Sequence, residues 1–275
     1  MNSSSRNFSI NTYCSHKTND AIYFNLADGN LPVLIQRYRI SHVLFLGGIV
    51  NFSILNQDPK KAEHINVDCT VRRIEESIDC GAVPVYFSSE SVFDGTRGNY
   101  TELDKPTPIF SYGIQKYTVE AFIQQKTDRY YILRLSKVFS SLGSTATLIT
   151  SWLDQLARGQ DIKVAEDNIF CPIHIEDAQR FVENLVGYAE HGIYHVCSPK
   201  AWSRAEMFDM VLEDYLRYSK YSGTVSRMRL HDIKGAEMLP LNTSMSSDKI
   251  EQATGYRAAS FEYWARTIVR EMLRK

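Results

Sequence analysis

The sequence lacks the features that mark secreted, membrane-bound or nucleic-acid-binding proteins. Among 275 residues there are five cysteines, and no two stand at C-x-x-C spacing, which argues against a disulfide framework or a zinc site. No apolar run approaches the length of a membrane span, and the N-terminus has no signal-peptide segment. The formal net charge of -1 gives no bulk attraction to nucleic acid or to an anionic membrane. We therefore expect a cytoplasmic protein without a metal, a nucleic-acid partner or membrane contact.

What the sequence does contain is a regular alternation of strand and helix in its first half. Continuous apolar runs predict buried parallel strands, and amphipathic stretches ending at glycine or polar residues predict helices. The strands are expected at 41–50, 82–89 and 129–139, and the helices at 31–39, 58–81 and 111–126. This order predicts an α/β fold with a doubly wound parallel sheet.

After about residue 140 the alternation loosens, which predicts a smaller mixed lobe. A helix is expected from Ser203, because this serine can cap it and Glu206 completes a capping box. The basic tail reads as a final amphipathic helix over 260–275. We expect an N-terminal domain over 1–140 and a substrate lobe over 141–275, with the strand at 192–199 returning to the sheet.

The segment between the second strand and the third helix has the residue types of a proton-transfer site. Tyr112 and Lys116 are four residues apart, so they share one face of a helix. A lysine ammonium favours the phenolate and would lower the tyrosine pKa from about 10. Ser88 or Ser89, at the carboxyl end of a parallel strand, could hydrogen-bond a substrate carbonyl there. A tyrosine beside a solvated lysine is the other interpretation of this spacing.

The wider context of this segment resembles a known family. "VYFSSESVFDG" followed by "YTELDKPTPIFSYGIQK" is similar to the extended short-chain dehydrogenase/reductases, in particular the dTDP-4-dehydrorhamnose reductase (RmlD-like) branch. The resemblance runs from about residue 20 to the end and implies a Rossmann-like fold. It also implies a catalytic set of Ser89, Tyr112 and Lys116. In that family the tyrosine donates a proton, the lysine also holds the nicotinamide ribose, and NADPH or NADH supplies the hydride.

The resemblance implies further contacts with cofactor and substrate. Gly47 and Gly48 match the small residues that let the cofactor pass close to a strand. Ser88, Glu90, Val92 and Lys137 match substrate-binding positions. Lys137 stands where the family often has a tryptophan that packs on the sugar.

The chain has no G-x-x-G-x-x-G loop, with which the family normally begins. About 25 residues of the usual first strand, loop and helix are missing, judged from the size of a strand–helix unit. In one interpretation the natural start lies upstream and the protein is an ordinary reductase. In the other, the shortened chain binds a nucleotide sugar or a partner without efficient hydride chemistry.

The function we expect is NAD(P)H-dependent reduction of a 4-keto nucleotide sugar in deoxysugar or polysaccharide biosynthesis. The alternative is a non-catalytic nucleotide-sugar-binding or regulatory subunit descended from such a reductase. A nonfunctional fragment is a third hypothesis, and it would aggregate through unpaired strand edges. The expected partners are a nucleotide sugar and, in a homodimer, a second copy of the chain.

Overall fold

The computed structural model describes residues 9–15, 17, 19–50, 52–140, 147–187, 189–233, 235–236 and 238–273. These residues divide into two compact units. The first unit comprises Met1–Val43 and Gly47–Pro84, and the second comprises Leu44–Leu46 and Val85–Lys275. The two units are described separately below.

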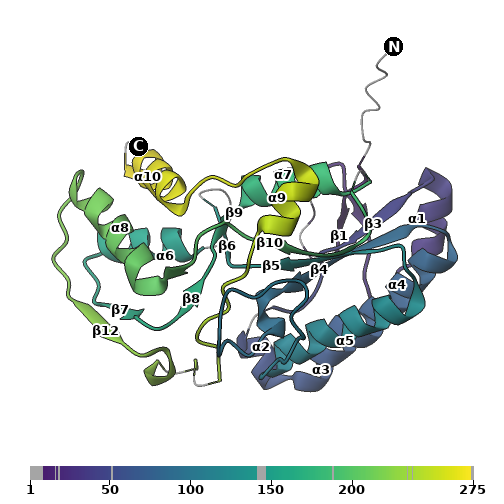
Figure 1. Cartoon of the computed structure of the whole chain (residues 1–275), viewed down its shortest axis with the longest axis horizontal. Coiled ribbons are helices and arrows are strands. Elements are labelled where there is room, and N and C mark those ends of the chain that lie inside the picture. The colour runs from purple at the N-terminus through teal and green to yellow at the C-terminus, as the bar shows by residue number, and fades with distance from the viewer. Residues whose placement is uncertain are drawn as a thin grey trace, which may run out of the picture. The chain divides into compact units, whose positions relative to one another are not determined.

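The first unit holds a short parallel strand pair and several helices (Figure 1). Its elements are β1 (Thr12–Tyr13), β2 (Ile22–Tyr23), α1 (Leu31–Tyr38), the start of β3 (His42–Phe45), α2 (Phe52–Gln57), α3 (Pro59–Glu63) and α4 (Thr70–Asp79). The side chain of Asn30 accepts a hydrogen bond from the backbone of Val33 and so caps α1. The long helix expected over 58–81 begins after Asp58, whose side chain caps it, but it contains a π-helical segment at His64–Cys69.

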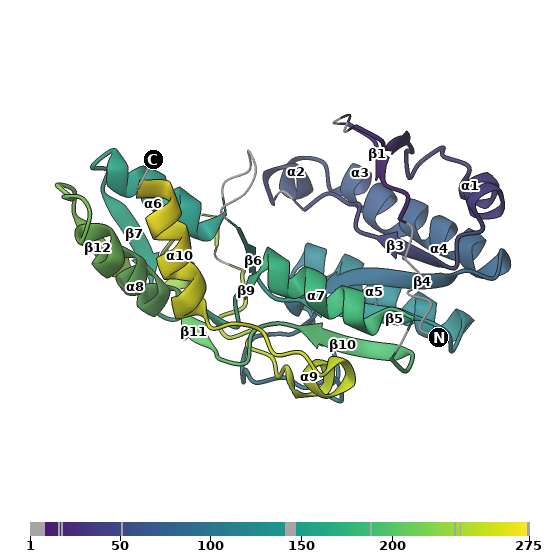
Figure 2. The ribbon, with the colours of Figure 1, turned by 90° about the horizontal axis from the view of Figure 1, so that it is seen from above.

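The second unit contains most of a four-stranded sheet with the order β10-β5-β4-β3, in which β5 pairs in parallel with both β10 and β4. Its strands include β4 (Val83–Ser89), β5 (Tyr131–Leu135) and β10 (Gly192–Val196). Helix α5 (Ser111–Lys126) lies on one face of β4 and β5, and α7 (Ile175–Leu185) lies on the other (Figures 1 and 2). The α/β fold with a parallel sheet is therefore confirmed. The carboxyl ends of β4, β5 and β10 lie at the same end of the sheet, since all three strands run in one direction.

The rest of the second unit contains a helical cluster and short strand pairs. The cluster consists of α6 (Leu148–Ala157), α8 (Arg204–Leu216) and α10 (Phe261–Leu273), whereas α9 (Asp248–Thr254) packs against α7 and β10. The pairs are β6 (Val138–Phe139) with β9 (Ile173–His174), β7 (Ile162–Ala165) with β12 (Val225–Met228), and β8 (Ile169–Phe170) with β11 (Trp202–Ser203). Figure 2 shows α6, α8 and α10 gathered beside the β7–β12 pair.

A hydrophobic core fixes this cluster in place. Trp152 and Phe208 pack edge to face with ring centroids 5.4 Å apart, and Phe261 is buried with them. The predicted capping box at the start of α8 is present, with Ser203 and Glu206 each bonding the other's backbone. Across the described part of the chain, none of the helices has the length and apolar character to cross a membrane.

Candidate active site

Strand β4 ends in two serines whose side chains have different surroundings. The hydroxyl of Ser89 accepts a hydrogen bond from the backbone N–H of Ser91 at 3.2 Å, so its proton stays available for another acceptor. Ser88 is 5% exposed, and its hydroxyl has no hydrogen-bond partner within the described residues. A buried hydroxyl without a partner costs free energy, which is a reason to look for a ligand here.

The turn after β4 packs tightly against the start of α5. A 3-10 helix follows the strand at Glu90–Val92, and Thr107 donates its backbone N–H to the carbonyl of Val92 at 2.9 Å. Gly113 lies directly against the carbonyl oxygen of Ser91, so closely that a Cβ at this position would collide with it. A glycine is therefore required after Tyr112 for helix α5 to approach the end of β4.

Lys116 is buried where α5 crosses β4. Its Nζ donates to the carbonyl of Phe87 at 2.8 Å and lies 4.8 Å from the ring centroid of Tyr86. Burial lowers the pKa of Lys116 from 10.5 to about 8, while the carboxylate of Glu120, one turn along the helix, acts to raise it. Lys116 therefore carries its charge at neutral pH and loses it just above.

Tyr112 lies on the same face of α5, and the ammonium of Lys116 is 5.7 Å from its ring centroid. Burial, with a further contribution from the Glu90 carboxylate, raises the pKa of Tyr112 from 10.0 to about 12. The expectation that this pKa lies below 10 is wrong for the protein without ligands, because desolvation disfavours the phenolate. The tyrosine consequently keeps its proton at neutral pH, as a proton donor must.

Glu90 is a buried carboxyl group next to this pair. It is 3% exposed, it accepts a hydrogen bond from the Ser136 hydroxyl at 2.5 Å, and it lies 3.7 Å from the ammonium of Lys137. Burial raises the pKa of Glu90, and the charge of Lys137 is the main influence acting against that rise. The side chain of Lys137 is 48% exposed, so this cation faces both Glu90 and solvent.

The structure places the other predicted residues as follows. The side chain of Val92 is fully buried in a hydrophobic cluster with Phe93 and Met245, which leaves it no exposed surface for a ligand. Gly47 and Gly48 belong to the first unit. At Gly48 the φ angle is 153°, and a Cβ would lie 3.0 Å from the side-chain oxygen of Asn66.

Glu120, one helical turn from Lys116, belongs to a buried ion pair that the sequence did not predict. Glu120 and Arg134 have side chains no more than 1% exposed, and they meet through contacts of 2.7 to 3.3 Å. The ring of His195 approaches Arg134 at 3.5 Å, and burial together with this cation lowers the His195 pKa to about 3. Glu120 and Arg134 lie 14 residues apart in different elements, so no local spacing in the sequence indicates their pairing.

Arg204, the first residue of α8, was also missed. Burial lowers its pKa, and the nearby Glu90 carboxylate acts in the opposite direction. Because the chain order separates Arg204 from Glu90 by more than 100 residues, no local pattern brings the two together.

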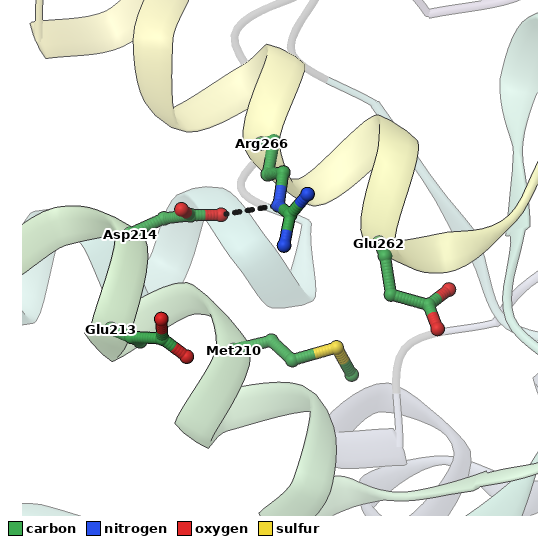
Figure 3. A pocket seen from close by; sticks show the side chains of 5 residues that line it. All are labelled: Met210, Glu213, Asp214, Glu262 and Arg266. Atoms are coloured by element: carbon green, nitrogen blue, oxygen red, sulfur yellow. Dashed lines mark ion pairs between the residues drawn. The ribbon is translucent and has the colours of Figure 1, made fainter.

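A small hollow lies elsewhere in the second unit, between α8 and α10 (Figure 3). It is lined by Met210, Glu213, Asp214, Glu262 and Arg266, and the last of these pairs with Asp214 at 3.5 Å. Its volume is about 20 Å³, which suits a water molecule and not a nucleotide. None of the predicted site residues lines it.

Comparison with known proteins gives consistent results. Residues 32–274 match the family described as RmlD substrate binding domain. The dTDP-4-dehydrorhamnose reductase of Sinorhizobium fredii is 26% identical over 231 residues, which cover 78% of this chain and 75% of that protein. Methionine adenosyltransferase 2 subunit beta of Xenopus tropicalis is 27% identical over 238 residues, covering 84% and 70%.

A solved structure shows the same fold. The dTDP-4-dehydrorhamnose reductase of Bacillus anthracis, crystallised in complex with NADP, superposes with a TM-score of 0.76. It is 21% identical, and the match covers 88% of this chain and 84% of that one.

Proposed function

Because the chain belongs to the RmlD substrate binding domain family, we propose that it reduces a 4-keto nucleotide sugar with NADPH or NADH. The observation that carries the proposal is the arrangement of Tyr112 and Lys116. They share one face of α5 beside the carboxyl end of β4, and at neutral pH the tyrosine holds its proton and the lysine its charge.

Each of the three residues has a separate task in this reaction. Ser89 donates its hydroxyl proton to the substrate carbonyl and orients it. Tyr112 gives its proton to the oxygen as negative charge develops there. Lys116 supplies positive charge that stabilises the phenolate left on Tyr112, a contribution that grows during the reaction because the free protein holds the tyrosine protonated.

The residues at the end of β4 fit the sugar portion of a nicotinamide cofactor. Lys116 uses one of its three N–H groups on Phe87, and Ser88 presents a buried hydroxyl without a partner among the described residues. Both can bond ribose hydroxyls. When bound, the cofactor would supply the hydride.

Titration of the purified chain with NADPH and with NADH, followed by cofactor fluorescence, tests this proposal. We expect binding at micromolar strength that is weakened in Lys116→Met. Lys126→Met is the matched control, because Lys126 is an exposed lysine in the last turn of the same helix. A folded protein that binds neither cofactor up to millimolar concentration would overturn the proposal.

A second function is favoured by one specific observation. The chain matches methionine adenosyltransferase 2 subunit beta of Xenopus tropicalis over 84% of its length. A regulatory subunit that binds a nucleotide sugar without reducing it would fit this match. Under this alternative a calorimetric titration would detect nucleotide-sugar binding, and neither the wild type nor Tyr112→Phe would reduce the bound sugar.

A further inference from the structure

Arg204 is held in a fixed orientation by a buried amide. Its Nε donates to the side-chain oxygen of Asn168 at 3.2 Å, and its backbone N–H donates to the Asn168 carbonyl at 2.9 Å. Asn168 is 6% exposed, and its amide nitrogen reaches the carbonyls of Pro240 and Leu241, each at 3.4 Å. The amide therefore cannot rotate without losing bonds on both sides.

This arrangement leaves one edge of the guanidinium available. Among the described residues, Asn168 is the hydrogen-bond partner of the Arg204 side chain, and it occupies Nε. The two terminal nitrogens remain, and they form the fork that matches a carboxylate or a phosphate. Neither terminal nitrogen is among the fully buried side-chain atoms that lack a partner in the described part of the chain, so both are accessible to an anion that enters from solvent.

A second cation lies beside the same carboxyl group. Lys137 pairs with Glu90 at 3.7 Å, and Glu90 is close enough to Arg204 to influence its pKa. Glu90 carries at most one negative charge, and one of its oxygens already accepts a hydrogen bond from Ser136. The net charge of Arg204, Lys137 and Glu90 together is therefore at least +1.

We propose that Arg204 and Lys137 bind an oxyanion of the nucleotide-sugar substrate, an inference that rests on the proposed function. The anion is a carboxylate on the sugar ring or a phosphate of the nucleotide. The carboxylate is favoured by position, because Lys137 lies 3.7 Å from Glu90, and Glu90 directly follows the two serines that end β4, where the substrate carbonyl is proposed to bind.

Calorimetric titration of the full chain with UDP, dTDP-glucose, UDP-glucose and UDP-glucuronic acid tests this inference. The last two probes differ only in the carboxylate on the sugar. We expect Arg204→Gln and Lys137→Gln each to weaken binding about tenfold or more, the effect of losing a charged hydrogen bond. Loss confined to UDP-glucuronic acid identifies the sugar carboxylate, and equal loss for all four probes identifies the phosphate.

The variants are chosen so that folding and function can be separated. Lys137 is half-exposed, so its substitution is expected to leave the fold intact even if Arg204→Gln destabilises α8 by stranding Asn168. Arg158→Gln is the control, since the ion pair of Arg158 with Asp154 is exposed to solvent. If the wild type binds nucleotide sugars and both variants bind them with the same affinity, this inference is overturned but the proposed function is not. A wild-type chain that binds none of the four probes overturns the nucleotide-sugar assignment and this inference together.

Discussion

Replacing Lys116 with methionine tests whether a buried charge is kept at the centre of the site. The side chain is 9% exposed, and its pKa falls from 10.5 to about 8 because burial penalises the ammonium. Each pKa unit corresponds to about 1.4 kcal/mol, so the fall corresponds to about 3 kcal/mol of stability that the folded chain gives up at neutral pH. Methionine fills similar space and carries no charge at any pH.

The sign of the pH dependence follows from proton binding. Between pH 8 and 10.5 the unfolded chain holds a proton on Lys116 that the folded chain has lost, so this group makes the protein more stable as pH rises. The wild type should therefore gain about 2 to 3 kcal/mol relative to Lys116→Met between pH 7 and pH 10. Loss of the Lys116 hydrogen bond to Phe87 changes the difference in unfolding free energy between the two proteins by a constant amount. It does not change how that difference varies with pH.

Urea unfolding of both proteins at a series of pH values measures the difference. Contributions from other titrating groups cancel to the extent that both proteins share them. The control Lys126→Met should show no such trend, because its lysine is exposed. A difference between wild type and Lys116→Met that is flat from pH 7 to pH 10, or that shrinks as pH rises, would refute the assignment of a buried, charged lysine.

Three further predictions concern other parts of the site. Tyr112→Phe should lower kcat for carbonyl reduction about a hundredfold or more while cofactor affinity and unfolding midpoint stay unchanged, as steady-state kinetics and fluorescence titration will show. Glu120→Gln should cost about 3 to 5 kcal/mol in denaturant unfolding by leaving Arg134 buried without its partner, whereas the double replacement of both by methionine should cost much less. Gly113→Ala should lower the melting temperature by several degrees, because its Cβ collides with the Ser91 carbonyl; a melting curve like that of the wild type would show that the turn can move aside.

The sequence predicts those elements best whose pattern is set locally. The helix expected over 111–126 is α5 with the same ends, and the strand expected over 82–89 is β4 within one residue. Both have continuous patterns bounded by prolines, glycine or polar residues, so the local signal and the tertiary packing agree. The capping box at Ser203 is also a local pattern and was found.

What could not be predicted depends on contacts between distant segments. One example is the buried ion pair of Glu120 and Arg134, and another is the hydrogen bond from Arg204 to Asn168. Each joins residues that are distant in the sequence. The pKa of Tyr112 is another example: spacing shows the neighbouring lysine, but the extent of desolvation depends on what packs over the ring. The division into domains at residue 140, and the roles of Gly47 and Gly48, stay predictions.

Isotope transfer is the most direct test of the central claim that the chain performs carbonyl reduction at Tyr112. The protein is incubated with a 4-keto nucleotide sugar and NADPH or NADH that carries deuterium at the transferred position, and the sugar product is examined by mass spectrometry. We predict one deuterium at C4 of the product with the wild type, and incorporation about a hundredfold or more slower with Tyr112→Phe. A folded wild type that binds both ligands but leaves no deuterium in the sugar would contradict the account.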